Sequence, residues 1–163
     1  MFWKSKKNDQ HNLGIINEVI ETSHSIVNSL MRDIRERFSE FDLGDQSIWE
    51  RNLFLTCIGT TLFCNNRAFY DEKLKKALQI LNDRLLEEGF LYVAEYLTHM
   101  SKVSFNSDIS GDKIQEHLAV WLYINIRNTE GFVEEETPPY AFAGTIIHQV
   151  FGDILDKHSI AMK

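Results

Sequence analysis

The chain has 163 residues, the size of one domain, and its 44% hydrophobic and 25% charged residues are typical of a globular protein. The formal net charge of −7 repels phosphate backbones, which argues against nucleic acid as a partner. No apolar run reaches membrane-spanning length, and no signal-peptide pattern opens the chain.

Only two prolines and eight glycines interrupt long apolar periodicity, which predicts an all-α fold. We expect a single domain over residues 1–163, built as a bundle of about six helices with a long N-terminal helix. Residues 1–7 contain three lysines and are expected to form a frayed basic tail. Removing these three lysines from the 17 basic residues leaves 14 against 24 acidic residues, a net charge of −10. The body would therefore attract a cationic partner.

The first predicted helix covers residues 8–40 and presents one apolar face. That face consists of Leu13, Ile16, Ile20, Val27, Met31, Ile34 and Phe38. Gly44 then breaks the chain, and Ser47 with Glu50 predicts a capping box for a second helix that ends near Asn65.

Three more helices are predicted before the C-terminal third of the chain. The third is capped by Asp71, carries Leu74, Leu78, Leu81 and Leu85 on one face, and ends at Gly89. The fourth covers residues 90–102. The fifth covers 112–127 and follows a loop rich in turn-forming residues.

The sixth predicted helix starts at the double proline of the chain. Thr137 suits the N-cap position and Pro138 suits the first helical position, so we expect a helix from there to about His158. The three glutamates that precede it are favoured by the positive end of the helix dipole.

The same region contains more acid than a helix start requires. Between Arg127 and Lys157 there is no Lys or Arg. Six carboxylates lie in that span: Glu130, Glu134, Glu135, Glu136, Asp153 and Asp156. One interpretation is a solvated acidic loop. The other is a patch on which a basic protein partner docks.

Histidines on apolar helix faces suggest a second kind of site. Glu21 and His24 form E-x-x-H, the spacing that places two metal ligands on one helix face, but no second copy follows. His24 lies in the middle of an apolar face, and His117 and His158 lie on or near theirs. These residues could hold a metal, or the histidines could be hydrogen-bonded members of the core. His99 is expected to point away from its apolar stripe.

One strip of the sixth helix combines small residues with a histidine. It consists of Ala141, Gly144, His148, Gly152 and Leu155. Glycines inside a helix reduce its stability, so close approach of another backbone is the usual reason for them. The strip therefore predicts tight helix packing or, alternatively, a groove in which His148 contacts a ligand or a partner.

Catalytic and phosphate-binding motifs such as G-x-S-x-G and G-x-x-x-x-G-K do not occur. Cys57 and Cys64 would be about 10 Å apart along one helix, too far for a disulfide, which favours a reducing, cytoplasmic location. We predict no cofactor. The leading hypothesis is a small, acidic, non-enzymatic protein-binding module, an immunity- or antitoxin-like inhibitor of a basic protein. The alternative is a helical metal- or small-ligand-binding protein; the oligomeric state stays open.

Overall fold

The computed structural model confirms the all-α class. It describes residues 2–64, 79, 83–85, 87–104, 111–131 and 133–161. Within these residues, five α-helices and one short 3-10 helix have defined bounds, and there is no strand. The elements are α1 (Phe2–Arg37), α2 (Gln46–Cys64), α4 (Glu87–Ser104), α5 (Gly111–Arg127), the 3-10 helix η2 (Glu134–Glu136) and α6 (Pro138–Ala161).

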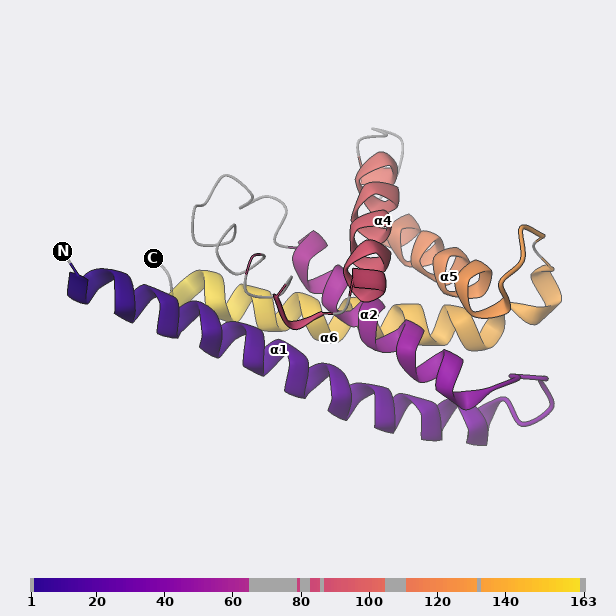
Figure 1. Ribbon diagram of the computed structural model, residues 1–163. Coiled ribbons are helices and arrows are strands. Elements are labelled where there is room, and N and C mark those ends of the chain that lie inside the picture. The colour runs from indigo at the N-terminus through magenta and orange to yellow at the C-terminus, as the bar shows by residue number, and fades with distance from the viewer. Residues whose placement is uncertain are drawn as a thin grey trace.

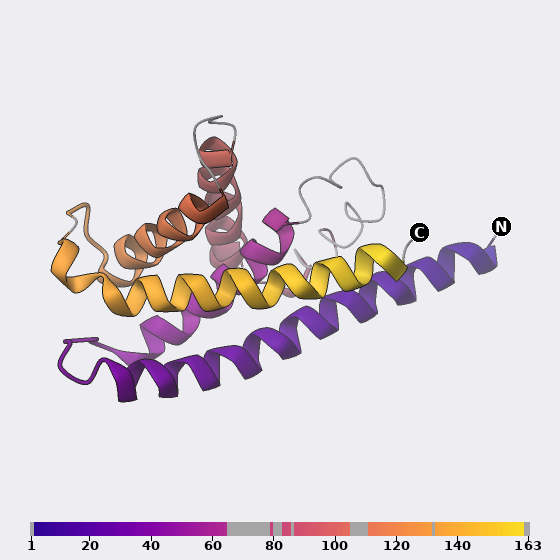
Figure 2. The same ribbon diagram turned by 180° about the vertical axis from the view of Figure 1, so that it is seen from behind.

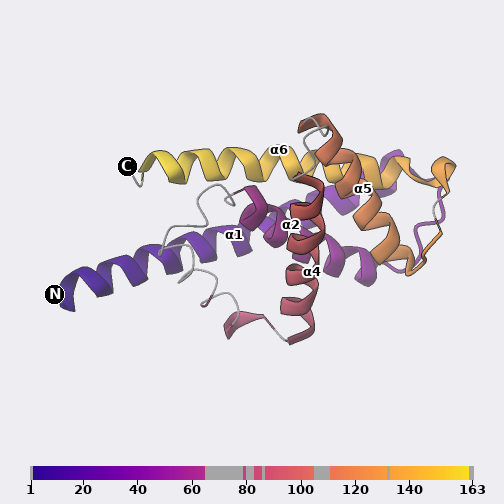
Figure 3. The ribbon, with the colours of Figure 1, turned by 90° about the horizontal axis from the view of Figure 1, so that it is seen from above.

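The helices form a bundle around α2, which contacts α1, α4, α5 and α6. α5 also packs on α6, and the long helices α1 and α6 run along the molecule (Figures 1 and 2). Seen from above in Figure 3, the α1–α2 loop and the α5–α6 connection lie at the end of the molecule opposite the N-terminus of α1. Two connections that are far apart in the sequence therefore meet at one end. No helix in the described part of the chain combines the length and apolarity needed to cross a membrane.

α2 is central because nearly all of its faces are buried, as expected for a helix without a solvent-facing stripe. Leu53 and Cys57 are completely buried. The buried hydroxyl of Thr60 donates to the Thr56 carbonyl oxygen at 2.8 Å and lies 2.8 Å from the Tyr96 hydroxyl. The core thus accepts threonines because their hydroxyls are hydrogen-bonded.

The first helix differs from its prediction at both ends and at His24, while the described residues of its predicted apolar face are buried or partly buried. It begins at Phe2, so residues 2–7 continue the helix and do not form a separate tail, and it ends at Arg37. Its buried stripe passes through Ser23, whose hydroxyl donates to the Val19 carbonyl oxygen at 2.6 Å. His24 is one position further round the helix, a rotation of about 100°, and is exposed. The expectation that His24 sits inside the apolar face is wrong.

The start of α2 is capped by a different residue from the one predicted. Gly44 breaks the chain as expected, with a φ of 68°. The side chain of Asp45, however, accepts hydrogen bonds from the Ser47 amide at 2.8 Å and from its hydroxyl at 2.9 Å. These bonds favour the charged carboxylate and lower the pKa of Asp45. Asp45 therefore caps the helix, and the Ser47–Glu50 capping box does not form.

The later helices follow their predictions unevenly. The predicted third helix, with its cap at Asp71, falls mostly on residues outside the described part, so the five bounded helices do not match the predicted six. Gly89 was expected to end that helix but lies inside the first turn of α4, against Leu55. α5 keeps its predicted end at Arg127. α6 begins at Pro138 as predicted, with the Tyr140 amide donating to the Thr137 carbonyl oxygen at 3.0 Å.

Candidate functional site: an acidic end and an adjoining groove

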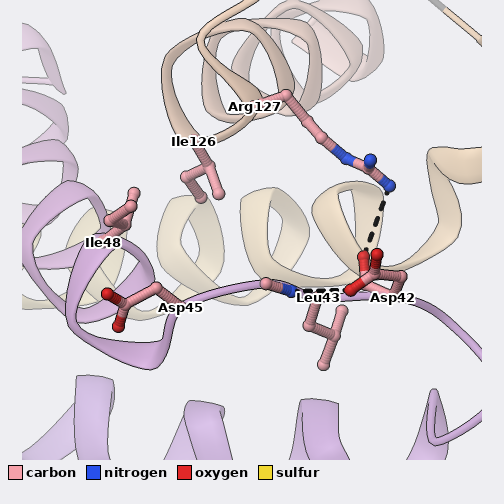
Figure 4. A pocket seen from close by; sticks show the side chains of 7 residues that line it. Asp42, Leu43, Asp45, Ile48, Ile126 and Arg127 are labelled. Atoms are coloured by element: carbon pink, nitrogen blue, oxygen red, sulfur yellow. Dashed lines mark hydrogen bonds between the residues drawn. The ribbon is translucent and has the colours of Figure 1, made fainter.

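Arg127, at the end of α5, joins the two connections at one end of the molecule. Its guanidinium donates to the Asp42 carbonyl oxygen at 3.3 Å and to the Tyr140 hydroxyl at 3.2 Å, and it lies 3.2 Å from the Glu136 carboxylate. Figure 4 shows the side chain reaching across from α5 to the α1–α2 loop. The hydrogen bond to Tyr140 is the main reason that the pKa of Arg127 is raised. The arginine stays charged and holds both connections together.

Aromatic side chains of the core pack against the residues that Arg127 joins. Trp49 is completely buried and stacks on Tyr140 with ring centroids 4.7 Å apart. Its indole nitrogen donates to the Leu43 carbonyl oxygen at 2.6 Å, which anchors the α1–α2 loop on the core. Tyr123 packs edge-on against Tyr140, at 5.0 Å between centroids. The loops therefore rest on a packed aromatic platform.

The predicted acidic patch divides into paired and exposed carboxylates. Glu130, Glu134 and Glu135 are exposed. Glu136 is only partly exposed and accepts a hydrogen bond from the Tyr123 hydroxyl at 2.8 Å, in addition to its pairing with Arg127. The expectation that all six acids lack a counter-charge is wrong for Glu136. Asp153 and Asp156 lie on α6, and their side chains are outside the described part.

A second acidic segment, which the sequence interpretation missed, lies beside the first. The α1–α2 loop contributes three exposed carboxylates, and residues 38–50 contain no Lys or Arg, like residues 128–137. The absence of Lys and Arg from residues 38–50 is the sequence signal by which this second acidic segment could have been predicted. We call the combined surface the acidic end. Its exposed carboxylates are Glu40, Asp42, Asp45, Glu130, Glu134 and Glu135.

Two surface hollows adjoin the acidic end. A pocket of about 200 Å³ lies between the α1–α2 loop and the end of α5, as Figure 4 shows. A larger groove of about 520 Å³ runs between α2, α4 and the end of α5. Ile48 and Ile126 line both hollows, so they share one wall. The acidic end therefore continues into a partly apolar groove.

Those residues of the metal hypothesis whose side chains the structure describes are not gathered into one site. His24 and Glu21 are exposed on α1, and His24 stacks on Phe54 with centroids 4.4 Å apart. His117 lies on α5, half-buried, and the side chain of His158 is outside the described part. Among the described residues, no group of three or more His, Cys, Asp or Glu side chains is placed to hold a metal ion.

His99 is placed differently from its prediction. It is half-buried between α4 and α5, with its ring 5.5 Å from that of Trp121 and 6.3 Å from that of His117. Its Nε2 atom is buried and has no hydrogen-bond partner within the described structure. Burial, followed by the nearby His117 and Lys102, lowers the pKa of His99. The arrangement favours a neutral imidazole at neutral pH.

Gly144 is explained by close packing of α6 on α5. A Cβ atom at Gly144 would lie 3.1 Å from Leu118 Cδ2 and 3.3 Å from the Ala119 amide nitrogen. The backbone of α5 therefore fills the space that a groove at Gly144 would need. His148 is half-buried beside it, with Nδ1 3.4 Å from the side-chain nitrogen of Gln115. Gly152 lies further along α6, where side-chain surroundings are outside the described part.

Cys57 does not have the surroundings of a nucleophile. Its side chain is completely buried in the core, and burial raises the pKa of its thiol. A reactive cysteine needs the opposite, an accessible position that lowers its pKa.

Comparison of the chain with known protein families, curated proteins and solved structures found no match.

Proposed function

We propose that the protein is a small acidic protein-binding module that recognises a basic protein partner through its acidic end. The observation that carries this proposal is the meeting of two segments, residues 38–50 and 128–137, that contain eight acidic residues and no Lys or Arg. Arg127 joins them by contacting the Asp42 carbonyl oxygen and the Glu136 carboxylate. The remaining exposed carboxylates face solvent.

Charge at one end of a molecule acts mainly on the approach of a partner. Exposed carboxylates within about 10 Å of one another add their fields at moderate ionic strength, and such a field steers a basic protein toward the docking surface. The aromatic platform beneath the loops supports a fixed presentation of the charges, which lowers the entropy lost on binding. In this proposal the module inhibits its partner by covering a basic functional surface, as an immunity protein or antitoxin does.

Site-specific crosslinking in the native host tests the proposal. A photo-crosslinking amino acid replaces Glu135 in one variant and Glu116, an exposed glutamate near the other end of α5, in a control variant. We expect the position in the acidic end to capture one basic protein that the control position does not capture. The captured protein is identified by mass spectrometry and then purified for binding measurements.

Two results would contradict the proposal. Equal capture by both positions would indicate non-specific attraction to an acidic protein. Capture of an acidic or neutral partner at Glu135 would show that contact there does not depend on opposite charge. Either result would remove the acidic end as a recognition surface for a basic protein.

A further inference from the structure

The groove beside the acidic end is lined by polar and apolar residues, and two of its large apolar side chains are exposed. It lies between α2, α4 and the end of α5. Leu91 on α4 is 53% exposed and Ile48 on α2 is 44% exposed, while Leu55 between them is buried. Large side chains exposed together beside a hollow are typical of a surface that binds another protein.

Hydrogen bonds fix the floor of the groove. The Tyr92 hydroxyl accepts from the Trp121 indole nitrogen at 3.0 Å and lies 2.9 Å from the Thr56 hydroxyl. Burial raises the pKa of Tyr92 to about 12, so it stays neutral. The Asn52 side chain donates to the Ile48 carbonyl oxygen at 2.8 Å. A floor with its polar groups satisfied is preformed for an apolar surface.

The α4 wall of the groove combines charge with apolar surface at helical spacing. Glu88, Leu91 and Glu95 line it at positions i, i+3 and i+7, so the carboxylates are about 10 Å apart along the helix. Glu88 lies 3.3 Å from Arg51, but both side chains are largely exposed and such a pair is weak. Glu95 forms no ion pair within the described residues. The wall can accept two cations that are two helical turns apart.

We propose that this groove binds an amphipathic helix of the partner, with its apolar face on Leu91 and Ile48 and basic residues toward Glu88 and Glu95. This inference rests on the proposed function, since it assigns part of the same basic partner to the groove. Helices dock in such grooves through apolar residues at i, i+3, i+4 and i+7. Lysines or arginines seven residues apart on that helix match the spacing of the two glutamates.

The shared wall at Ile48 and Ile126 places the groove directly beside the acidic end. One basic partner can therefore contact both surfaces at once. The acidic end then sets the rate of encounter, and burial of apolar side chains in the groove sets the lifetime of the complex. These two contributions are separable by mutation.

A designed peptide tests the groove without the natural partner. The probe has about 14 residues, two lysines seven positions apart and leucines between them on the same face; a scrambled peptide of equal composition is its control. Both are titrated into the full-length protein by fluorescence anisotropy and by NMR. We expect the designed peptide alone to shift the resonances of Ile48, Leu91 and Glu95. Leu91→Ala should weaken its binding about tenfold, because an apolar contact is lost.

Ile124→Ala is the matched control, since Ile124 is an exposed apolar residue of α5 that does not line the groove. The Ile124→Ala protein should bind the designed peptide with the same dissociation constant as the wild type. Equal binding of the scrambled peptide, or no effect of Leu91→Ala, would overturn the groove proposal. Dimerisation of the free protein that Leu91→Ala abolishes would also overturn it, because the occupant would be a second copy of the chain.

Binding measurements with the captured partner distinguish the groove proposal from the proposed function. If reversing the charge of Glu134 and Glu135 slows association while Leu91→Ala changes nothing, the groove proposal fails and the proposed function stands. If Leu91→Ala shortens the lifetime of the complex while the charge reversal changes nothing, the acidic end fails as the recognition surface.

Discussion

Arg127 connects parts of the chain that are distant in sequence. Its guanidinium contacts the Asp42 carbonyl oxygen, 85 residues earlier, and also the Tyr140 hydroxyl and the Glu136 carboxylate. One side chain thereby holds the α1–α2 loop, η2 and α6 against the end of α5. The position of both loops of the acidic end depends on this residue.

We expect Arg127→Met to lower the free energy of unfolding by about 1–2 kcal/mol. The methionine keeps the apolar stem but removes the donor to the Tyr140 hydroxyl and the positive charge beside the partly buried Glu136, which keeps its hydrogen bond from Tyr123. The expected loss is no larger because the Arg127 side chain is 31% exposed, so solvent screens its charge. Urea unfolding followed by circular dichroism measures the change.

Arg51→Met is the control for the loss of a surface arginine. Arg51 is 60% exposed and, among the described residues, pairs with the highly exposed Glu88, so its replacement should change stability by less than about 0.5 kcal/mol. Equal losses of unfolding free energy in the two variants would show that the contacts of Arg127 stabilise the protein no more than an ordinary surface ion pair does.

Single side chains were the hardest features to predict from the sequence. Thr137 and Pro138 could be placed, because a helix start depends on local backbone chemistry. His24 was expected on the apolar face but is exposed, and the neighbouring Ser23 is buried instead, since a small difference in helix phase decides which position faces the core. Glu136 was expected to lack a counter-charge, and only the folded chain brings it to Arg127.

At the scale of helices, α2 shows how packing compensates for weak intrinsic propensity. Gly59 lies in the middle of this helix, where glycine is less favourable than alanine by about 1 kcal/mol. The ring of Tyr96 occupies the space beside it, and a Cβ atom at Gly59 would overlap Cδ1 of that ring. The Tyr96 hydroxyl is in turn held near Thr60 at 2.8 Å. α2 and α4 can approach this closely only at a glycine.

Gly59→Ala should therefore destabilise the protein by about 1–3 kcal/mol, although alanine is the better helix former. The added methyl group must displace a buried tyrosine that is hydrogen-bonded. Gly14→Ala on α1 is the matched control, because no described residue lies within 4 Å of its Cβ position, and it should stabilise by up to about 1 kcal/mol. Thermal unfolding of both variants compares them. Stabilisation by Gly59→Ala would contradict the close contact with Tyr96.

Helix positions followed from the sequence better than helix contacts did. The periodicity that predicts α5 is local, and its end at Arg127 was found. The packing of α6 on α5 at Gly144 was expected only as close approach of some backbone, and the sequence could not identify α5 as the partner. The groove between α2, α4 and α5 could not be predicted, because it exists only after those three helices are assembled.

At the scale of the whole molecule, two acidic segments that are far apart in the sequence lie at one end of the bundle (Figure 3). The sequence showed an acidic segment near the C-terminal third of the chain. It could not show that Glu40, Asp42 and Asp45 lie at the same end, since loop positions depend on how the helices pack (Figure 3). Those three carboxylates extend the predicted patch, whereas the paired Glu136 no longer contributes an uncompensated charge.

The rate of association with the captured partner, measured by stopped flow at several salt concentrations, tests the central claim most directly. Glu134→Lys combined with Glu135→Lys should slow association about tenfold at low salt and flatten its dependence on salt. Asp83→Lys combined with Glu116→Lys makes the same change of charge at exposed sites outside the acidic end. This control should leave the rate of association and its dependence on salt nearly unchanged. Equal effects of the two double variants, or none, would contradict recognition of a basic partner by the acidic end.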